Sequence, residues 1–98
     1  MKPVSRAVDR LLGKLGIATE VDRVGSIAHW GAAARDVLGD DATVTRAVAV
    51  DGATLIVAVP TSAWASEIRL REAALLERIA RAAPKSGIRS IRTVPSTR

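Results

Sequence analysis

The strongest constraint on the fold is a turn dipeptide between two strand-like stretches in the middle of the chain. Residues 44–50 and 55–59 alternate valine or leucine with other residues, and Asp51 and Gly52 lie between them. Alternation with period two is typical of half-buried strands, and Asp-Gly is a preferred two-residue hairpin turn. The sequence therefore predicts a β-hairpin over residues 44–59.

The alternation also predicts a register for this hairpin. A two-residue turn gives these pairs: Val50 with Ala53, Val48 with Leu55, and Val44 with Val59. The paired side chains would share one face, but Arg46 would lie on that face too, opposite Val57. Either Arg46 extends its guanidinium past the edge of the sheet or a β-bulge shifts the register, and the pattern leaves both open.

Helices are predicted on both sides of the hairpin. Apolar residues recur at three- and four-residue steps over residues 4–15, 24–38 and 62–83. Gly16, Gly39 and Pro84 follow these stretches and would end the helices. The buried stripe of the last helix comprises Trp64, Ile68, Leu75, Ile79 and Ala82. Leu70 points away from this stripe, so it is either packed by a neighbouring element or part of a partner contact.

A short β-branched stretch over residues 88–94 predicts a third strand at an edge of the sheet. The predicted order is α-α-β-β-α-β, which gives an α+β fold. At 98 residues the chain fits a single domain. We expect that domain to span residues 1–98, with a folded core over 3–94 and a short tail over 95–98. A core this small leaves self-association open.

The chain has a formal net charge of +5. Its basic residues are concentrated near both ends, and its acidic residues lie mainly in the middle. Four cations recur every four residues near the start and would form a ridge along the first helix: Lys2, Arg6, Arg10 and Lys14. Like charges this close repel one another unless an anion neutralises them. The ridge is therefore a candidate for phosphate contact, and the alternative is a solvated helix face.

Few residues in the chain are suited to catalysis. It has no cysteine and one histidine, which excludes thiol nucleophiles and thiolate metal sites. It also has no GxxxxGK(S/T) string and no GxGxxG after a strand, which argues against ATP hydrolysis. We expect no enzyme, no metal and no cofactor. With no apolar stretch of roughly 18–20 residues and no secretory signal, we expect a cytoplasmic protein without a membrane partner.

The middle of the chain resembles the DciA family of replicative-helicase loaders. The run from the Asp-Gly turn onward matches the family pattern dG-x-L-x-V-x-V-x-x-S-x-W-x-x-E-L, with isoleucine at the last position. The residues that carry the resemblance include Trp30, Asp51, Gly52, Leu55, Val57, Val59, Ser62, Trp64, Glu67 and Ile68. The resemblance extends over most of residues 4–94 and is specific mainly between Trp30 and Ile79.

This resemblance implies a KH-like domain, in which a three-stranded sheet has its helices packed on one face. It implies ATP-independent loading of a DnaB-type helicase in DNA replication, at the nucleoid and replication fork, through binding to helicase and DNA. KH modules grip nucleic acid with a GXXG loop between two helices, and this chain has no such loop. We expect the tail over 95–98 in place of the long extension that family members often carry.

Within this interpretation, DNA is bound through its phosphates, in single-stranded form and without sequence specificity. The expected contacts are Lys2, Arg6, Arg10, Lys14, Arg71, Arg78, Arg81, Lys85, Arg89 and Arg92. Trp30 and Trp64 are expected in the core. The helicase contact could be Leu70, the acidic middle of the chain or residues 17–23, and the sequence leaves these three alternatives open. The alternative function is a KH-like RNA-binding module in translation or RNA processing, which would be expected to have a GXXG loop or stacking aromatic residues.

Overall fold

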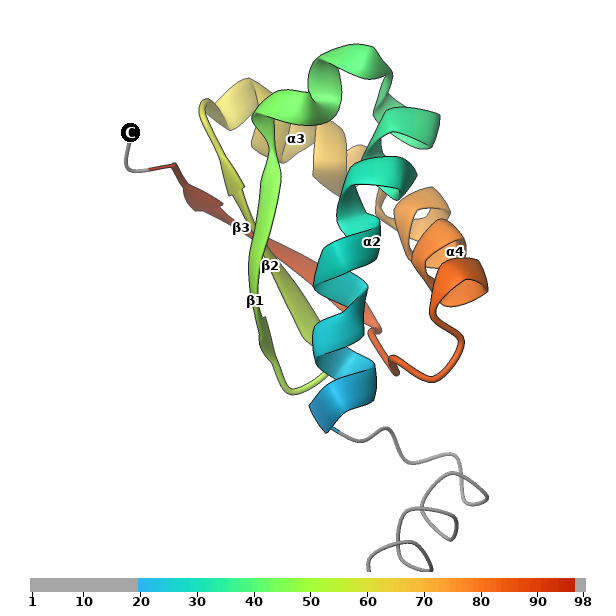
Figure 1. Cartoon of the computed structure of the whole chain (residues 1–98). Helices are drawn as coiled ribbons and strands as arrows, with labels where there is room; N and C mark the ends of the chain where they lie inside the picture. Colours follow the sequence, from blue (N-terminus) through green and yellow to red (C-terminus); the bar gives the residue numbers. More distant parts are fainter. Residues whose placement is uncertain (1–19, 97–98) are drawn as a thin grey trace, which may run out of the picture.

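The computed structural model describes residues 20–96, with side chains from residue 24 onward. The elements are α2 (Glu20–Leu38), the 3-10 helix η1 (Asp40–Val44), β1 (Arg46–Asp51), β2 (Thr54–Val59), α3 (Ser62–Leu70), α4 (Glu72–Ala82) and β3 (Ser90–Pro95) (Figure 1). The fold is α+β with a three-stranded mixed sheet, which confirms the predicted class. The predicted helix over residues 4–15 and its basic ridge lie outside the described residues. Within the described part of the chain, no helix is long and apolar enough to cross a membrane.

Helix α2 confirms the second predicted helix and supplies the largest core side chain. It ends at Leu38 because Gly39 has a φ of 98°, a backbone conformation that glycine adopts without strain. Trp30 is 2% exposed, and its Nε1 donates to Thr45 Oγ1 at 3.1 Å. The Thr45 hydroxyl donates in turn to the Ala42 carbonyl at 2.6 Å. The buried indole N–H is therefore satisfied, and the core position predicted for Trp30 is confirmed.

The predicted hairpin is present, but its register near the turn differs. Val50 pairs with Leu55, whereas the sequence predicted Ala53 as its partner. The first strand continues through Asp51, so the two turn residues are Gly52 and Ala53. Gly52 has a φ of 63°, which places the residue that tolerates a positive φ first in the turn. The predicted pairs are wrong by two residues here.

A β-bulge at Val48 decides the position of Arg46. The register shifts between Ala47 and Ala49, and this shift buries Ala47 in the core and leaves Arg46 exposed. Val48 is 42% exposed, and Val44, which lies in η1, is 53% exposed. The bulge alternative is therefore the one found. The common buried face predicted for these residues is confirmed for Leu55, Val57 and Val59 and wrong for Val44 and Val48. The bulge accounts for Val48, because one extra residue in a strand reverses which side chains face the core.

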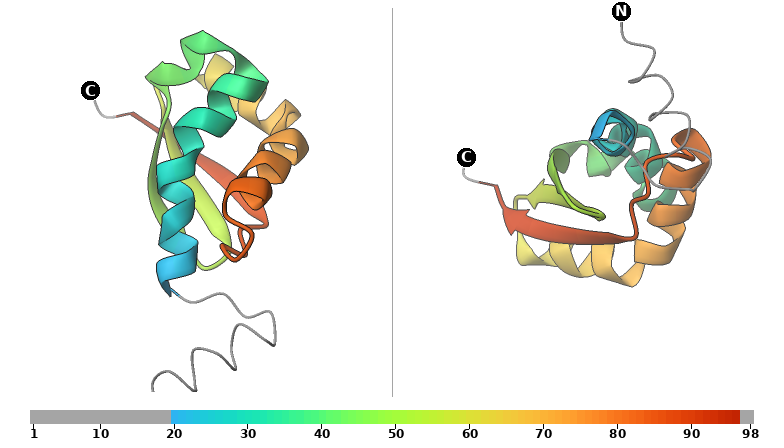
Figure 2. Two further views of the ribbon diagram at one scale, coloured as in Figure 1. Left: turned by 45° about the vertical axis from the view of Figure 1, so that its right-hand side comes forward. Right: turned by 90° about the horizontal axis from the view of Figure 1, so that it is seen from below.

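The single helix predicted over residues 62–83 is two helices. Helix α3 ends at Leu70, and the N–H of Arg71 donates to both the Glu67 and Ile68 carbonyls at 3.1 Å. A six-residue strand extends about 20 Å, whereas a straight helix over 62–83 would extend about 33 Å. The break lets α4 turn and lie beside α2 (Figure 2). The observed order is α-η-β-β-α-α-β over the described residues, which corrects the prediction of one helix after the hairpin.

The core joins all three helices to the sheet. Its buried residues include Trp30, Ala33, Ala34, Ala47, Leu55, Val57, Val59, Ile68, Leu75 and Ile79. The predicted stripe is confirmed at Ile68, Leu75 and Ile79, and Trp64 packs against the core but is only half-buried. Ala82, the last residue of α4, is exposed, contrary to the prediction.

Strand β3 lies at an edge of the sheet, as predicted, and pairs with β2 in parallel. Because side chains alternate along a strand, β2 directs Leu55, Val57 and Val59 to the core and its other residues to the opposite face. That opposite face, called the outer sheet face below, consists of Arg46, Ala49 and Asp51 of β1, Thr54, Ile56 and Ala58 of β2, and Ser90, Arg92 and Val94 of β3.

Candidate functional site

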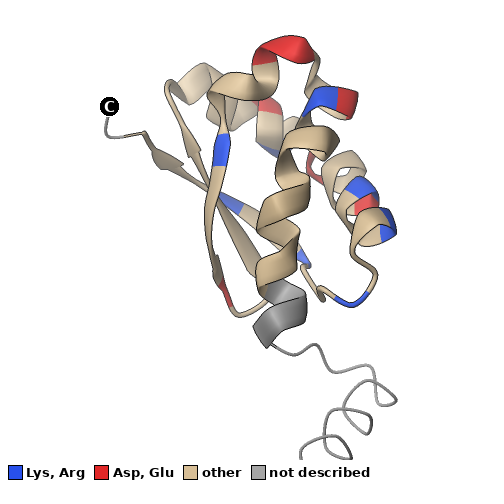
Figure 3. Cartoon of the chain, viewed as in Figure 1, with Lys and Arg blue, Asp and Glu red and all other residues tan. Residues whose placement is uncertain are grey.

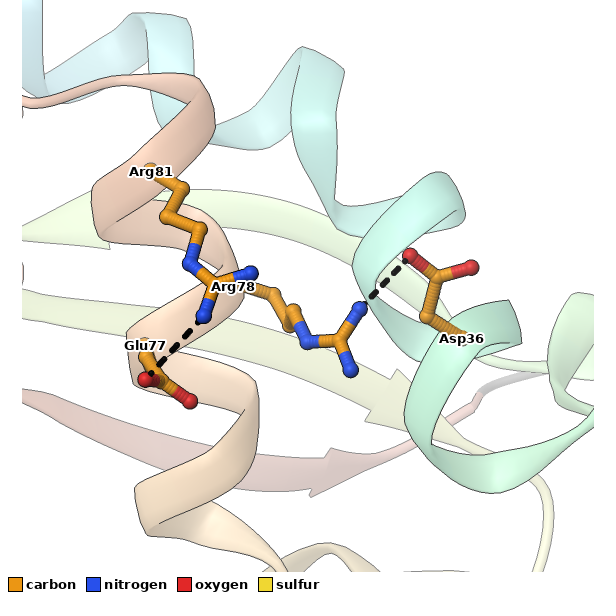
Figure 4. Close-up of polar contacts among 4 residues, drawn as sticks. All are labelled: Asp36, Glu77, Arg78 and Arg81. Atoms are coloured by element: carbon orange, nitrogen blue, oxygen red, sulfur yellow. Dashed lines mark hydrogen bonds and ion pairs between the residues drawn. The ribbon is translucent and has the colours of Figure 1, made fainter.

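Three of the predicted phosphate-binding arginines form ion pairs within the protein. The pairs are Arg71 Nε with Glu67 Oε2 at 3.5 Å, Arg78 Nη1 with Asp36 Oδ2 at 3.2 Å, and Arg81 Nη2 with Glu77 Oε2 at 3.4 Å. Figure 4 shows the pair between α4 and α2 and the pair within α4. Exposed pairs of this kind contribute little to stability, about 0–1 kcal/mol. Their effect here is to neutralise the charge of these arginines locally, which weakens them as phosphate contacts.

The other predicted cations of the described region lack such partners. Lys85, Arg89 and Arg92 have no ion pair within residues 24–96 and lie on the α4–β3 connection and on β3 (Figure 3). The structure adds Arg35, Arg46 and Arg69 to this unpaired set, and none of the three was predicted as a phosphate contact. Arg46 was detectable as the charge that conflicted with the hairpin pattern. Nothing in the sequence distinguishes Arg69 from the paired arginines that follow it.

The outer sheet face brings two of these unpaired arginines onto one surface. Arg46 lies in register with Ala58, and Arg92 lies in register with Ile56, one position further along β2 on the same face. Because β2 lies between β1 and β3, the strands that carry the two arginines are about 10 Å apart across the sheet. The exposed Val48 adjoins them at the bulge. This surface therefore combines two guanidinium groups with an apolar strip.

A groove runs between α3 and the free edge of β3. Two adjoining cavities of about 250 and 320 Å³ make it up, and both are lined by Ala65 and Thr93. The first cavity is mostly apolar, and its other lining residues are Val59, Pro60, Thr61, Ser62, Val94 and Pro95. The second is more polar, and its other lining residues are Ile68, Arg69, Glu72, Ile91 and Arg92. The carboxylate of Glu72 accepts a hydrogen bond from the Ile91 N–H at 2.8 Å.

Leu70 forms an isolated apolar protrusion at the junction of α3 and α4. Its side chain is 79% exposed, so the alternative in which a neighbouring element packs on it is wrong. Arg69 and Arg71, the adjacent residues, are exposed as well. Half-buried Trp64 lies elsewhere on α3, where it lines a shallow cavity of about 290 Å³ with Leu38 and two other α3 residues. The junction thus presents one large aliphatic side chain between two cations.

The remaining motif residues serve the fold. Asp51 and Gly52 lie at the exposed hairpin turn, and Leu55 and Ile68 are buried in the core. Within the described residues, no group of three or more histidine, cysteine, aspartate or glutamate residues could hold a metal ion. The arrangement of the described residues offers surfaces for binding.

Comparison with known proteins identifies the family of this chain. No curated protein matches the chain. The family model described as "Dna[CI] antecedent, DciA" matches residues 3–93 of the 98-residue chain. This family is a helicase-loader family of DNA replication, associated with DnaB helicase loading. The match covers nearly the whole chain and confirms the resemblance drawn from the Asp-Gly to Trp-Glu motif. The chain therefore belongs to the DciA family.

Proposed function

We propose that the protein is an ATP-independent adaptor that binds a DnaB-type replicative helicase with one surface and the DNA backbone with another. Membership of the DciA family, over residues 3–93, is the observation that carries this proposal. The sequence lacks a nucleotide-binding loop, which supports loading without ATP hydrolysis by this chain. The proposal places the protein in the cytoplasm at the replication fork, as a single KH-like domain.

The DNA surface of this proposal is the outer sheet face together with the α4–β3 connection. Arg46 and Arg92 lie on the sheet, and Arg89 lies next to the hairpin turn, where its N–H donates to the Ala53 carbonyl at 2.7 Å. The chain also enters α2 at Glu20 at the end of the molecule where the hairpin turn lies (Figure 1). The basic segment before Glu20 therefore joins the fold at the end that carries Arg89.

Phosphates are the expected ligands of this surface, because the unpaired cations are not accompanied by exposed aromatic residues that could stack on bases. The chain has two tryptophans, no tyrosine and no phenylalanine, and Trp30 is buried. Contacts to phosphate carry no sequence information by themselves. Binding without sequence preference follows. The sequence of α3 and α4 argues against the RNA-binding alternative. A KH module needs a GXXG loop at its helix junction, and no glycine lies in residues 62–82.

Helicase capture is the experiment that tests the proposed function. The full chain is immobilised and incubated with the host's replicative helicase, with and without single-stranded DNA, in buffer depleted of ATP. We expect capture in the absence of ATP and a ternary complex when DNA is added. Failure to retain the helicase under both conditions would overturn the loader function and favour the RNA-binding alternative, which an RNA pull-down would then examine.

The DNA surface is tested by a double variant with a matched control. Lys85→Ala with Arg89→Ala removes two unpaired cations, and affinity for single-stranded DNA is expected to fall and to depend less on salt. Each lost phosphate contact should lower the slope of log affinity against log salt by about 0.7, or about 0.9 for duplex DNA. The measurement is fluorescence anisotropy between 50 and 200 mM salt.

The control, Arg78→Ala with Arg81→Ala, removes the same charge from residues that are paired with Asp36 and Glu77. Its salt slope is expected to stay close to that of the unmodified protein. Equal loss of affinity in the two double variants would show that net charge alone governs binding, and the assignment of this DNA surface would then be wrong.

A further inference from the structure

Strand β3 exposes one side of its backbone along a free edge. The N–H groups of Ser90 and Ser96 donate to carbonyls of the β2 segment, at 3.3 and 2.7 Å. Because backbone groups alternate sides along a strand, Ile91, Thr93 and Pro95 direct theirs away from β2. The sheet order β1-β2-β3 places no further strand on that side within the described residues. The backbone of β3 can therefore accept another strand.

At both ends of this edge, the backbone has no free outward N–H for a further strand. The Ile91 N–H is occupied by the Glu72 carboxylate at 2.8 Å, and Pro95 has no N–H to donate. Thr93 lies between them, and its outward N–H has no acceptor within residues 20–96. Such devices block open-ended pairing between sheets. They leave room only for a short segment, since residues 91–95 extend about 13–16 Å.

The space beside Thr93 is a groove that an extended chain could occupy. The two cavities described above meet at Thr93 and Ala65, and the larger one, about 320 Å³, lies within the usual size range of ligand pockets, about 300–1,000 Å³. One end of the groove is lined by apolar residues, including Val59, Pro60 and Pro95. A bound strand would thus pair its backbone with Thr93 while its side chains contact α3.

Charge in the groove selects the kind of strand. Arg69 and Arg92 line the second cavity, and neither has an ion-pair partner within the described part of the chain. Glu72, the one carboxylate there, already accepts the Ile91 N–H. An acidic side chain would complement the two arginines. Single-stranded nucleic acid fits less well, because no aromatic residue that could stack on a base lines the groove.

We propose that the free edge of β3 binds a short extended segment of a partner protein by strand addition. The segment pairs with the backbone of Thr93, places an acidic side chain between Arg69 and Arg92, and places small apolar side chains toward Pro60 and Pro95. Strand addition takes its affinity from main-chain hydrogen bonds and its specificity from pockets for alternate side chains. This interaction does not require that the protein loads a helicase.

The test is selection from a phage-displayed library of random heptapeptides on the full-length protein. We expect enrichment of peptides in which an aspartate or glutamate follows or precedes small or β-branched residues. Affinity of a selected peptide is expected to fall about tenfold in Thr93→Pro, which removes one outward N–H and leaves the pairing with β2 intact. In two-dimensional NMR spectra, the Thr93 amide should shift on titration with the selected peptide.

Charge reversal gives a second variant that does not alter the strand. Arg69→Glu is exposed on α3 and is expected to shift the selection from acidic to basic peptides. Arg35→Glu, an exposed and unpaired arginine on α2, is the matched control and should leave the selection unchanged. The proposal is overturned if no sequence is enriched, if selected peptides bind Thr93→Pro as tightly as the unmodified protein, or if an oligothymidylate shifts the Thr93 amide and the peptides do not.

Discussion

Trp30→Ala is expected to destabilise the domain by about 3–5 kcal/mol, the range for truncating a large buried aromatic side chain. Trp30 of α2 is 2% exposed and belongs to the same core cluster as buried residues of η1 and the sheet. Domains are stable by about 5–15 kcal/mol in total, so the variant should be largely or partly unfolded at 37 °C. The loss has two parts, because the truncation leaves a cavity and also removes the indole donor of Thr45 Oγ1. Urea unfolding followed by far-ultraviolet circular dichroism measures the free energy of unfolding.

Trp30→Phe separates these two parts, and Trp64→Ala compares the centre of the core with its margin. Trp30→Phe keeps most of the apolar volume and removes the hydrogen bond to Thr45, so it should cost clearly less than Trp30→Ala. Trp64→Ala should also cost less, because Trp64 is half-buried at the margin of the core. If Trp64→Ala unfolded the domain and Trp30→Ala did not, the assignment of Trp30 as the centre of the core would be wrong.

The hairpin shows how far local pattern determines this fold. Alternating residues on either side of an Asp-Gly pair were sufficient to predict two strands and a tight turn between them. The register was not predictable, because a bulge at Val48 depends on whether Ala47 or Arg46 faces the core. That choice rests on space beneath β1, where Ala33 and Ala34 of α2 are buried in the same core. Only tertiary packing contains this information.

The break between α3 and α4 has a similar origin. Residues 62–82 contain neither glycine nor proline, so helical periodicity continues through Arg71 without a stop signal. The break is favoured by the short sheet, along which a straight helix would overrun the strands. Its consequence is the exposure of Leu70, because the change of axis at this residue leaves no neighbouring element to cover it. The sequence predicted that Leu70 leaves the stripe but left open what contacts it.

The sequence predicted most of the cations of the candidate DNA surface, but it did not predict which of them form ion pairs within the protein. The pairing of Arg81 with Glu77 follows from an i,i+4 spacing that can be read in the sequence. The pairing of Arg78 with Asp36 joins residues 42 positions apart and appears only once α4 lies beside α2. Such pairs decide which cations remain free for phosphates. This is why Lys85, Arg89 and Arg92 remain candidates, while Arg71, Arg78 and Arg81 are weaker ones.

Leu70→Ser is expected to abolish most helicase capture without unfolding the protein. A single large aliphatic side chain that projects from a helix end is suited to fill a pocket on a partner. If Leu70 is the hot spot of this contact, its truncation should cost about 2 kcal/mol or more. Affinity for the helicase should therefore fall at least about 30-fold. Because the side chain is 79% exposed, its removal should change the free energy of unfolding by less than about 0.5 kcal/mol. Surface plasmon resonance with immobilised helicase measures the affinity.

Val44→Ser is the matched control for this variant, because it also removes an exposed apolar side chain, 53% exposed, from a different surface of the domain. Its affinity for the helicase should match that of the unmodified protein. DNA binding should survive in both variants, since neither residue belongs to the outer sheet face or the α4–β3 connection. If Leu70→Ser bound the helicase normally while Val44→Ser did not, the contact would lie beside η1, and the junction of α3 and α4 would lose its assigned role.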